Sequence, residues 1–412
     1  MSPALHRTGR LAATVLSAAA LTAGLAACSA GNSGDEIKGG TESPSSGASQ
    51  VAVTLAAGSS GDTCTVDHDS AKAGPITFTI TNRSSTAITE LELLSDQKII
   101  AEKENLAPGL KPASFTLTLG GGRYQLYCPG GNPEMITFTV TGQAAARPAG
   151  TTQQLLADGT KEYGAYVSTQ IEGMVTGVEN LHNEVDAGDL DGARKAYGVA
   201  RPFYEHIETD VEGFVLPGHK ATDNSGNLDY LIDMRASNLD PSIGWHGFHA
   251  IERDLWQRGR ITGETRKLAA ELTRNVKKLA ALSKTLTFGP EDLANGAAGL
   301  LEEVQANKIK GEEENYSHTD LVDFAANVEG AQQSFAFLKP GLQKIDPALT
   351  TEISKRFTST TSMLDQYRDP QAIGGYRPYT ADLRASDANA LSQNVQALQD
   401  SLSRLAEKVA TA

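Results

Sequence analysis

The spacing of apolar residues changes once along this chain of 412 residues, and the change predicts two domains of different fold class. Up to residue 141, apolar residues occupy every second position of several short runs, which is the period of a β-strand with one buried face. From about residue 153 they recur at every third or fourth position, which is the period of an amphipathic α-helix. The alternating runs cover 51–55, 76–80, 115–119 and 136–140, and the helical runs cover 167–181, 268–286 and 391–409.

These runs predict a multidomain chain in which a small β-sandwich precedes an all-α helical bundle. Clusters of Gly and Pro separate the alternating runs, as expected for turns between short strands. We place the sandwich at 51–142, a linker at 143–152 and the bundle at 153–412. Within the last helical run, Ser386 and Asp387 predict the N-terminal cap of the helix.

The N-terminus has the composition of a bacterial secretion signal. Arg7 and Arg10 precede an Ala- and Leu-rich stretch that is too short to span a membrane. Because that stretch stops at Cys28, in the order Leu-Ala-Ala-Cys of a lipoprotein cleavage site, we expect a signal peptide over 1–27 and lipid attachment at Cys28. A Gly- and Ser-rich tether over 28–50 follows. The prediction is an extracytoplasmic, lipid-anchored protein, and a soluble secreted protein is the alternative.

The formal net charge of −14 limits the classes of partner. An acidic surface repels the phosphate backbone of nucleic acids, so we expect no nucleic-acid partner. The same surface attracts cations, which is compatible with metal binding without establishing it.

One short motif in the helical part carries a possible metal-binding pair. His249 and Glu252 are three residues apart, so on a helix both side chains project from one face and can share a metal ion. A His–Glu pair on the surface explains the same spacing, and taken alone the motif favours that simpler interpretation.

Other acidic residues along the helical part make the metal interpretation stronger. Glu205 and Glu208 form a second pair at helical spacing, Asp229 and Asp233 follow a Gly- and Asn-rich loop, and residues 311–320 hold a further acidic and histidine cluster. Helices of a bundle can bring such groups together. Several carboxylates with one imidazole suit iron, manganese or zinc better than copper(I).

Several separated segments resemble the family of EfeO-type iron-uptake lipoproteins, which combine a cupredoxin-like domain with an imelysin-like (peptidase M75-like) domain. The segments that carry the resemblance in the helical part are RPFYEHIE (201–208), LDYLIDMR (228–235), GFHAIE (247–252), KIKGEE (308–313), YSHTDL (316–321) and DFAANVEG (323–330). In the sandwich part they are ITELE (88–92) and ENLAPG (104–109). The resemblance covers nearly all of the chain beyond the signal peptide. It implies a cupredoxin-like sandwich and an imelysin-like bundle.

The resemblance also implies which residues bind metal. In the bundle the implied ligands are Glu205, Glu208, Asp233, His249, Glu252 and Glu313. Three consecutive glutamates leave the register of Glu313 open. The implied cargo is iron, Fe(II) or Fe(III), and Zn or Mn also suit these ligands.

The sandwich part has two interpretations that the sequence leaves open. In an oxidising compartment Cys64 and Cys128 form a disulfide readily. The resemblance implies instead a copper or iron site made by the two thiolates with Glu90. A blue-copper centre needs two His beside a Cys, and the only His in this part is His68.

Three functions compete on this evidence. The resemblance implies an iron-binding component of an EfeUOB-type uptake system, which delivers iron to an EfeU-type permease and works beside an EfeB-type peroxidase. A metal-dependent peptidase is the alternative. We expect no enzyme, because zinc peptidases use His-Glu-x-x-His or its inverse and Glu252 is followed by Arg253. A structural or polysaccharide-binding lipoprotein leaves the clustered ligands unexplained.

Overall fold

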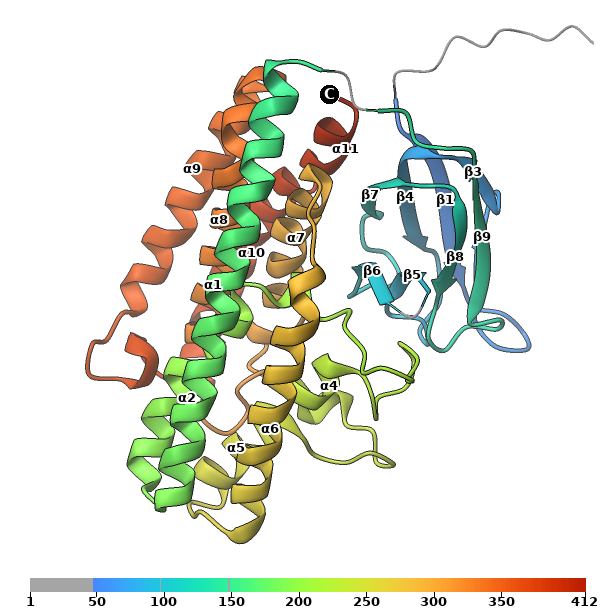
Figure 1. Cartoon of the computed structure of the whole chain (residues 1–412). Coiled ribbons are helices and arrows are strands. Elements are labelled where there is room, and N and C mark those ends of the chain that lie inside the picture. Colours follow the sequence, from blue (N-terminus) through green and yellow to red (C-terminus); the bar gives the residue numbers. More distant parts are fainter. Residues whose placement is uncertain (1–46, 97, 147–148) are drawn as a thin grey trace, which may run out of the picture. The chain divides into compact units, whose positions relative to one another are not determined.

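A computed structural model describes residues 47–96, 98–146 and 149–412 (Figure 1). The predicted signal peptide, the lipid attachment at Cys28 and most of the predicted tether lie outside the described residues. Within the described ranges, no helix combines the length and the apolar character needed to cross a membrane. The β-sheet region and the helical region are considered separately below.

The β-sheet region contains two sheets. The first has the strand order β2–β1–β4–β7, with β1 Ser49–Ala56, β2 Thr63–Val66, β4 Gly74–Asn82 and β7 Ala113–Leu119. The second has the order β3–β9–β8–β5–β6, with β3 Ser70–Lys72, β5 Leu91–Ser95, β6 Lys98–Lys103, β8 Gly122–Tyr127 and β9 Met135–Thr141. The pairs β1/β4 and β3/β9 are parallel, and the other pairs are antiparallel.

Alternating apolar side chains from both sheets form one core between them. Val51, Val53 and Leu55 of β1 are buried, and so are Phe78 of β4 and Phe138 of β9. The four alternating runs expected from the sequence therefore coincide with β1, β4, β7 and β9. The other strands are shorter or, like β5, have consecutive buried residues, so their period of two is weak.

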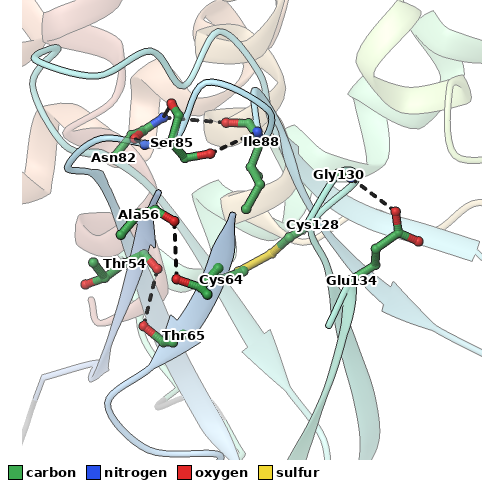
Figure 2. Close-up of a disulfide and its surroundings, with 11 residues drawn as sticks. Thr54, Ala56, Cys64, Thr65, Asn82, Ser85, Ile88, Cys128, Gly130 and Glu134 are labelled. Carbon is green, nitrogen blue, oxygen red and sulfur yellow. Dashed lines mark hydrogen bonds between the residues drawn. A yellow bond between two sulfur atoms is a disulfide. The ribbon is translucent and has the colours of Figure 1, made fainter. Parts of the chain in front are cut away.

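A disulfide joins the two sheets. Cys64 lies on β2 of the first sheet and Cys128 directly follows β8 of the second, and their sulfur atoms are bonded across the core (Figure 2). The Cα atoms are 6.4 Å apart, within the range of ordinary disulfides. Of the two alternatives left open by the sequence, the structure has the disulfide. Bonded sulfurs offer no thiolate to a metal ion.

The helical region begins with α1 Thr151–Ala187, whose 37 residues extend roughly 55 Å at the usual rise per residue. α1 packs against α2, α6 and α8 in the bundle (Figure 1). The remaining α-helices are α2 Leu190–Glu205, α3 Glu208–Val211, α4 Leu228–Asp233, α5 Gly247–Glu252, α6 Gly263–Leu282, α7 Pro290–Glu303, α8 Asp320–Ile345, α9 Pro347–Leu364, α10 Ala381–Leu402 and α11 Leu405–Ala410.

Short helices of other types join these elements. The 3₁₀ turns are η1 Ala236–Asn238, η3 Ser283–Thr285, η5 Asp365–Tyr367 and η6 Ile373–Gly375. Two π-helical turns, η2 Arg253–Gln257 and η4 Val304–Lys308, directly follow α5 and α7. Single π-helical turns inside or at the end of α-helices often occur at functional sites.

Two helix boundaries differ from the sequence prediction. The predicted cap at Ser386 and Asp387 is wrong, because α10 begins at Ala381 and the Thr380 hydroxyl accepts a hydrogen bond from the Leu383 N–H. The two good capping residues lie inside the first turns of the helix. The run 391–409 also spans two helices, because the helix is interrupted between α10 and α11. The apolar residues of the run are buried in both helices.

The disulfide generates a prediction for stability. Replacing both Cys64 and Cys128 with Ala should lower the free energy of unfolding by about 2–4 kcal/mol, because the unfolded chain regains the freedom that the cross-link removes. Urea titration of the mature chain under oxidising conditions measures this. Reductant in the titration should destabilise the wild type by the same amount and leave the double variant unchanged. A wild type that is insensitive to reductant in urea would contradict the disulfide.

Candidate metal centre

Glu205 and Glu208 come from the junction of two helices, and not from one helix face as predicted. α2 ends at Glu205, and α3 begins at Glu208 after two residues of turn. Both carboxylates still approach the same ammonium group: Lys308 Nζ lies 3.1 Å from Glu205 Oε2 and 3.7 Å from Glu208 Oε2. The predicted pair is therefore brought together, and all three side chains are buried.

A glycine brings Asp233 and His249 together. Asp233 is the last residue of α4, and α5 starts at Gly247, which has a φ of +70°. A Cβ atom at Gly247 would lie 2.1 Å from the Ile232 carbonyl oxygen, so only glycine lets α5 begin this close to the end of α4. As a result, His249 Nε2 lies 3.5 Å from Asp233 Oδ1.

The loop between η4 and α8 supplies the acidic residues of the 311–320 cluster. Glu313 and Glu314 are both buried, whereas Glu312 and His318 are exposed. Glu313 Oε1 lies 3.6 Å from His249 Nε2, and Glu314 Oε1 accepts a hydrogen bond of 2.7 Å from the Tyr197 hydroxyl. The sequence left open which of the three consecutive glutamates faces the cluster, and in the structure two of them, Glu313 and Glu314, are buried.

Glu252 anchors this loop. Its Oε1 accepts hydrogen bonds of 2.7 Å from the backbone N–H groups of Tyr316 and Ser317. Its other oxygen, Oε2, lies 3.3 Å from His249 Nδ1. Both oxygens of Glu252 are therefore engaged with protein groups, and the carboxylate connects α5 to the loop.

Three cations lie among these carboxylates. The Arg201 guanidinium contacts Glu205, Asp233, Glu313, Glu314 and Asp323. Lys308 contacts Glu205, Glu208 and Glu313. The partly buried Arg235 lies 3.2 Å from Glu313 Oε2 and 2.9 Å from Glu303 Oε2. Buried carboxylates nevertheless outnumber buried cations among the described residues, so the cluster favours a further positive charge or protons.

His249 presents a free ring nitrogen to this cluster. No described residue forms a hydrogen bond with Nε2, although that atom is buried. It faces Asp233 Oδ1 at 3.5 Å and Glu313 Oε1 at 3.6 Å, and the three side chains each offer a ligand atom within 4.8 Å of the others. Burial disfavours the imidazolium form, but the facing Asp233, Glu252 and Glu313 raise the pKa of His249 well above its ordinary value.

Two more groups of three side chains have the spacing of a metal site and share members with the first. These groups are His249–Glu252–Glu314 and Glu205–Glu313–Asp323. Of the ligands implied by the family resemblance, Glu205, Asp233, His249, Glu252 and Glu313 appear in at least one group. Glu208 appears in none of them and pairs with Lys308 at the edge of the cluster.

Several buried residues of the cluster were not among the ligands expected from the sequence. Arg201, Lys308, Glu314, Asp320 and Asp323 are all buried here. Arg201 is four residues before Glu205, a spacing that places them on one helix face, but sequence cannot tell a buried ion pair from a solvated one. Asp323 lies in the stretch 321–328, in which every residue is buried. The mainly apolar residues around it were the only local sign in the sequence that Asp323 is buried.

In the β-sheet region, the two cysteines are bonded to each other and so offer no thiolates for a metal site with Glu90. Glu90 instead forms a half-buried group with Glu102 and Glu104. Of the two alternatives left open by the sequence, the structure therefore has the disulfide and not the site of two thiolates with Glu90.

Comparison with known proteins assigns the helical region. The sequence model of the imelysin family, peptidase M75, matches residues 159–405. This chain belongs to the imelysin family. The chain is 37% identical over 250 residues to an "Efem/EfeO family lipoprotein" of Staphylococcus haemolyticus, which covers 60% of this chain and 82% of that protein. It is 34% identical over 337 residues to the "Iron uptake system component EfeO" of Escherichia coli K12, covering 81% of this chain and 85% of that protein. The imelysin match contains every residue of the cluster described above.

Buried acids near this imelysin site make stability depend on pH. Burial, followed by the charge of Glu314, raises the pKa of Asp320 to about 8 from an ordinary value of 3.8. Between these values the folded chain keeps a proton that the unfolded chain has lost, so stability falls as pH rises through this window.

Asp320→Asn should therefore stabilise the metal-free protein at pH 8 by roughly 1–3 kcal/mol and have little effect near pH 4. Thermal or urea unfolding across this pH range measures the difference. Asp346→Asn is the matched control, because Asp346 is a partly exposed helix cap whose pKa is lowered by its hydrogen bond from the Leu349 N–H. The control should destabilise at pH 8, and a gain of equal size in both variants would contradict the assignment to Asp320.

Proposed function

We propose that this protein is the iron-binding component of an uptake system outside the cell membrane, which captures Fe(II) or Fe(III) and delivers it to a membrane permease. The observation that carries the proposal is the free Nε2 of His249 facing Asp233 Oδ1 and Glu313 Oε1 in a buried, acidic cluster. The relatives named as iron-uptake components support iron as the cargo.

The donor set suits this cargo. Two carboxylates and one imidazole are the ligands that Fe(II), Mn(II) and Zn(II) accept, whereas copper(I) prefers sulfur. Asp233, His249 and Glu313 are the proposed ligands. Glu205 belongs to a second group, with Glu313 and Asp323, that shares Glu313 with the first. Glu205 is therefore the proposed additional ligand. The excess of carboxylates neutralises the charge of a bound cation.

Glu252 is proposed as a residue that orients His249. A histidine ligand commonly donates its second N–H to a carboxylate, which fixes the tautomer and the ring orientation. Glu252 Oε2 stands at Nδ1 of His249, so we infer that Nδ1 keeps its proton and that Nε2 releases its proton when it becomes the ligand atom. The backbone N–H groups of Tyr316 and Ser317 hold Glu252 in place for this task.

The remaining parts of the proposal concern location and partners. We infer a cell-envelope location with a lipid at Cys28, supported by the relative named as a lipoprotein. A permease of the EfeU type and a peroxidase of the EfeB type are the proposed partners. The two-sheet β region is proposed to be cupredoxin-like, with the disulfide in place of a copper–thiolate site.

The geometry gives little support to the peptidase alternative. A zinc peptidase needs a carboxylate that is free to activate a water molecule. Glu252 is fully buried and both of its oxygens are engaged. The family carries the label peptidase M75, but Arg253 stands where the inverse zinc-peptidase motif needs its second histidine.

The central test is iron binding by the mature protein. His249→Ala should weaken Fe(II) binding by more than about 100-fold, because it removes a direct ligand from a site of few ligands. Anaerobic titration against a chromogenic chelator measures the affinity. His246→Ala is the matched control, since His246 is three residues away and pairs with Glu271. Equal affinities of the two variants would refute the site. Metal-dependent cleavage of peptides by the wild type would revive the peptidase.

Glu252 allows a second test of the ligand set. Glu252→Gln keeps an oxygen for the backbone N–H groups but weakens the hold on His249 Nδ1, so the Fe(II) affinity should fall by about 10–100-fold, the usual effect of a group that orients a ligand. Asp233→Asn should cost more, because it alters a proposed ligand. The order of the two losses distinguishes the roles, and a larger loss for Glu252→Gln would make Glu252 the ligand.

A further inference from the structure

Arg201 contacts the same two oxygen atoms that face His249. Its Nη1 pairs with Asp233 Oδ1, and its Nη2 lies 3.1 Å from Glu313 Oε1. These are the carboxylate oxygens nearest to His249 Nε2, at 3.5 Å and 3.6 Å. The guanidinium fork therefore bridges the two oxygens that the proposed iron site requires.

A metal ion and this guanidinium cannot both bridge that pair of oxygens. Metal–oxygen bonds of about 2 Å bring the ion between the carboxylates, and at that distance a guanidinium on the same oxygens experiences strong like-charge repulsion in a buried site. One of the two cations has to leave when the other binds.

We propose that Arg201 is an internal competitor of the cargo ion: it pairs with Asp233 and Glu313 in the unloaded protein, gives way when iron binds, and returns when iron leaves. This inference rests on the proposed iron site. It explains how a buried, acidic site can release its ion, because the returning guanidinium satisfies the carboxylates that the ion vacates.

The surroundings of Arg201 offer the displaced side chain a second position. Its Nη2 also contacts Glu205 and lies 3.3 Å from Asp323 Oδ2, and its Nε lies 3.2 Å from Glu314 Oε1. The face of the Phe248 ring is 5.2 Å away and favours a cation beside it. Arg201 can therefore leave Asp233 and remain paired, so that displacement does not leave a buried charge alone.

Lys308 provides a matched comparison. It is as deeply buried as Arg201 and carries the same charge. Its contacts are Glu205 Oε2, Glu208 Oε2 and Glu313 Oε2, so it touches neither Asp233 nor the Glu313 oxygen that faces His249. A general effect of positive charge on iron binding would act through both residues, whereas competition for the two bridged oxygens is specific to Arg201.

The experiment compares Arg201→Met and Lys308→Met in the full mature protein, with Fe(II) alone as the probe under anaerobic conditions. Arg201→Met should bind Fe(II) at least about tenfold more tightly than the wild type, mainly through slower dissociation, as expected when one of two mutually exclusive cations is removed. Lys308→Met should show a clearly smaller gain or a loss. Arg201→Lys keeps the charge but loses the forked guanidinium, so its Fe(II) affinity should lie between those of the wild type and Arg201→Met. Arg201→Lys replaces Arg201→Met in the comparison if the latter does not fold.

Added guanidinium gives an independent readout. In Arg201→Ala, guanidinium chloride at millimolar, non-denaturing concentration should enter the space left by the side chain and weaken Fe(II) binding competitively. The wild type should not respond. A purely structural role for Arg201 predicts no such competition.

The outcomes separate the two proposals. If wild-type binding does not depend on His249, the iron site itself is wrong and the role of Arg201 falls with it. If wild-type binding depends on His249, but the Arg201 variants bind no more tightly and guanidinium does not compete, the site stands and the inference about Arg201 is overturned. Equal gains in Arg201→Met and Lys308→Met would also overturn it, since charge alone would then explain them.

Discussion

Carboxylates that are buried together repel one another, and the helical region is organised around the cations that offset this repulsion. Arg201 from α2 and Lys308 from η4 connect acids on α3, α4, α8 and the loop before α8. None of these segments buries its charge favourably alone, so the ion pairs require the elements to meet. Apolar burial is the main favourable term in folding, and the charged cluster links the helix ends that meet beside the apolar core.

The local backbone at the cluster consists of helix ends and turns. Asp233 and Glu205 are final residues of their helices, His249 lies on a helix of only six residues, and Glu313 lies in a loop. Short segments of this kind are held by tertiary contacts, such as the two N–H bonds to Glu252. The long helix α1 packs against α6 and α8, so the cluster is built from short segments on a frame of long helices.

The apolar period of the sequence was sufficient to predict β1, β4, β7 and β9 and parts of α1, α6 and α10, because each of these elements buries one regular face. It failed at α10, where Ser386 and Asp387 are good caps but Thr380 starts the helix. At the candidate site, residue types and family motifs predicted His249 and Asp233 as ligands, and the structure brings these two side chains together. They could not identify Arg201 and Lys308, because a charged residue in a helix is usually solvated and only the three-dimensional convergence of acids reveals why these two are buried.

The two ring nitrogens of His249 show how much of the function depends on geometry that sequence does not contain. The His-x-x-Glu spacing is satisfied equally by a metal bound between the two residues and by a carboxylate that orients the imidazole. The contacts favour orientation, since Glu252 stands at Nδ1 while Nε2 faces Asp233, Glu313 and the guanidinium that pairs with them. A carrier must bind its ion and also release it. In the proposed site, an imidazole oriented from Nδ1 binds the ion through Nε2, and a neighbouring arginine pairs with the carboxylates on the Nε2 side, so residues around a single histidine meet both requirements.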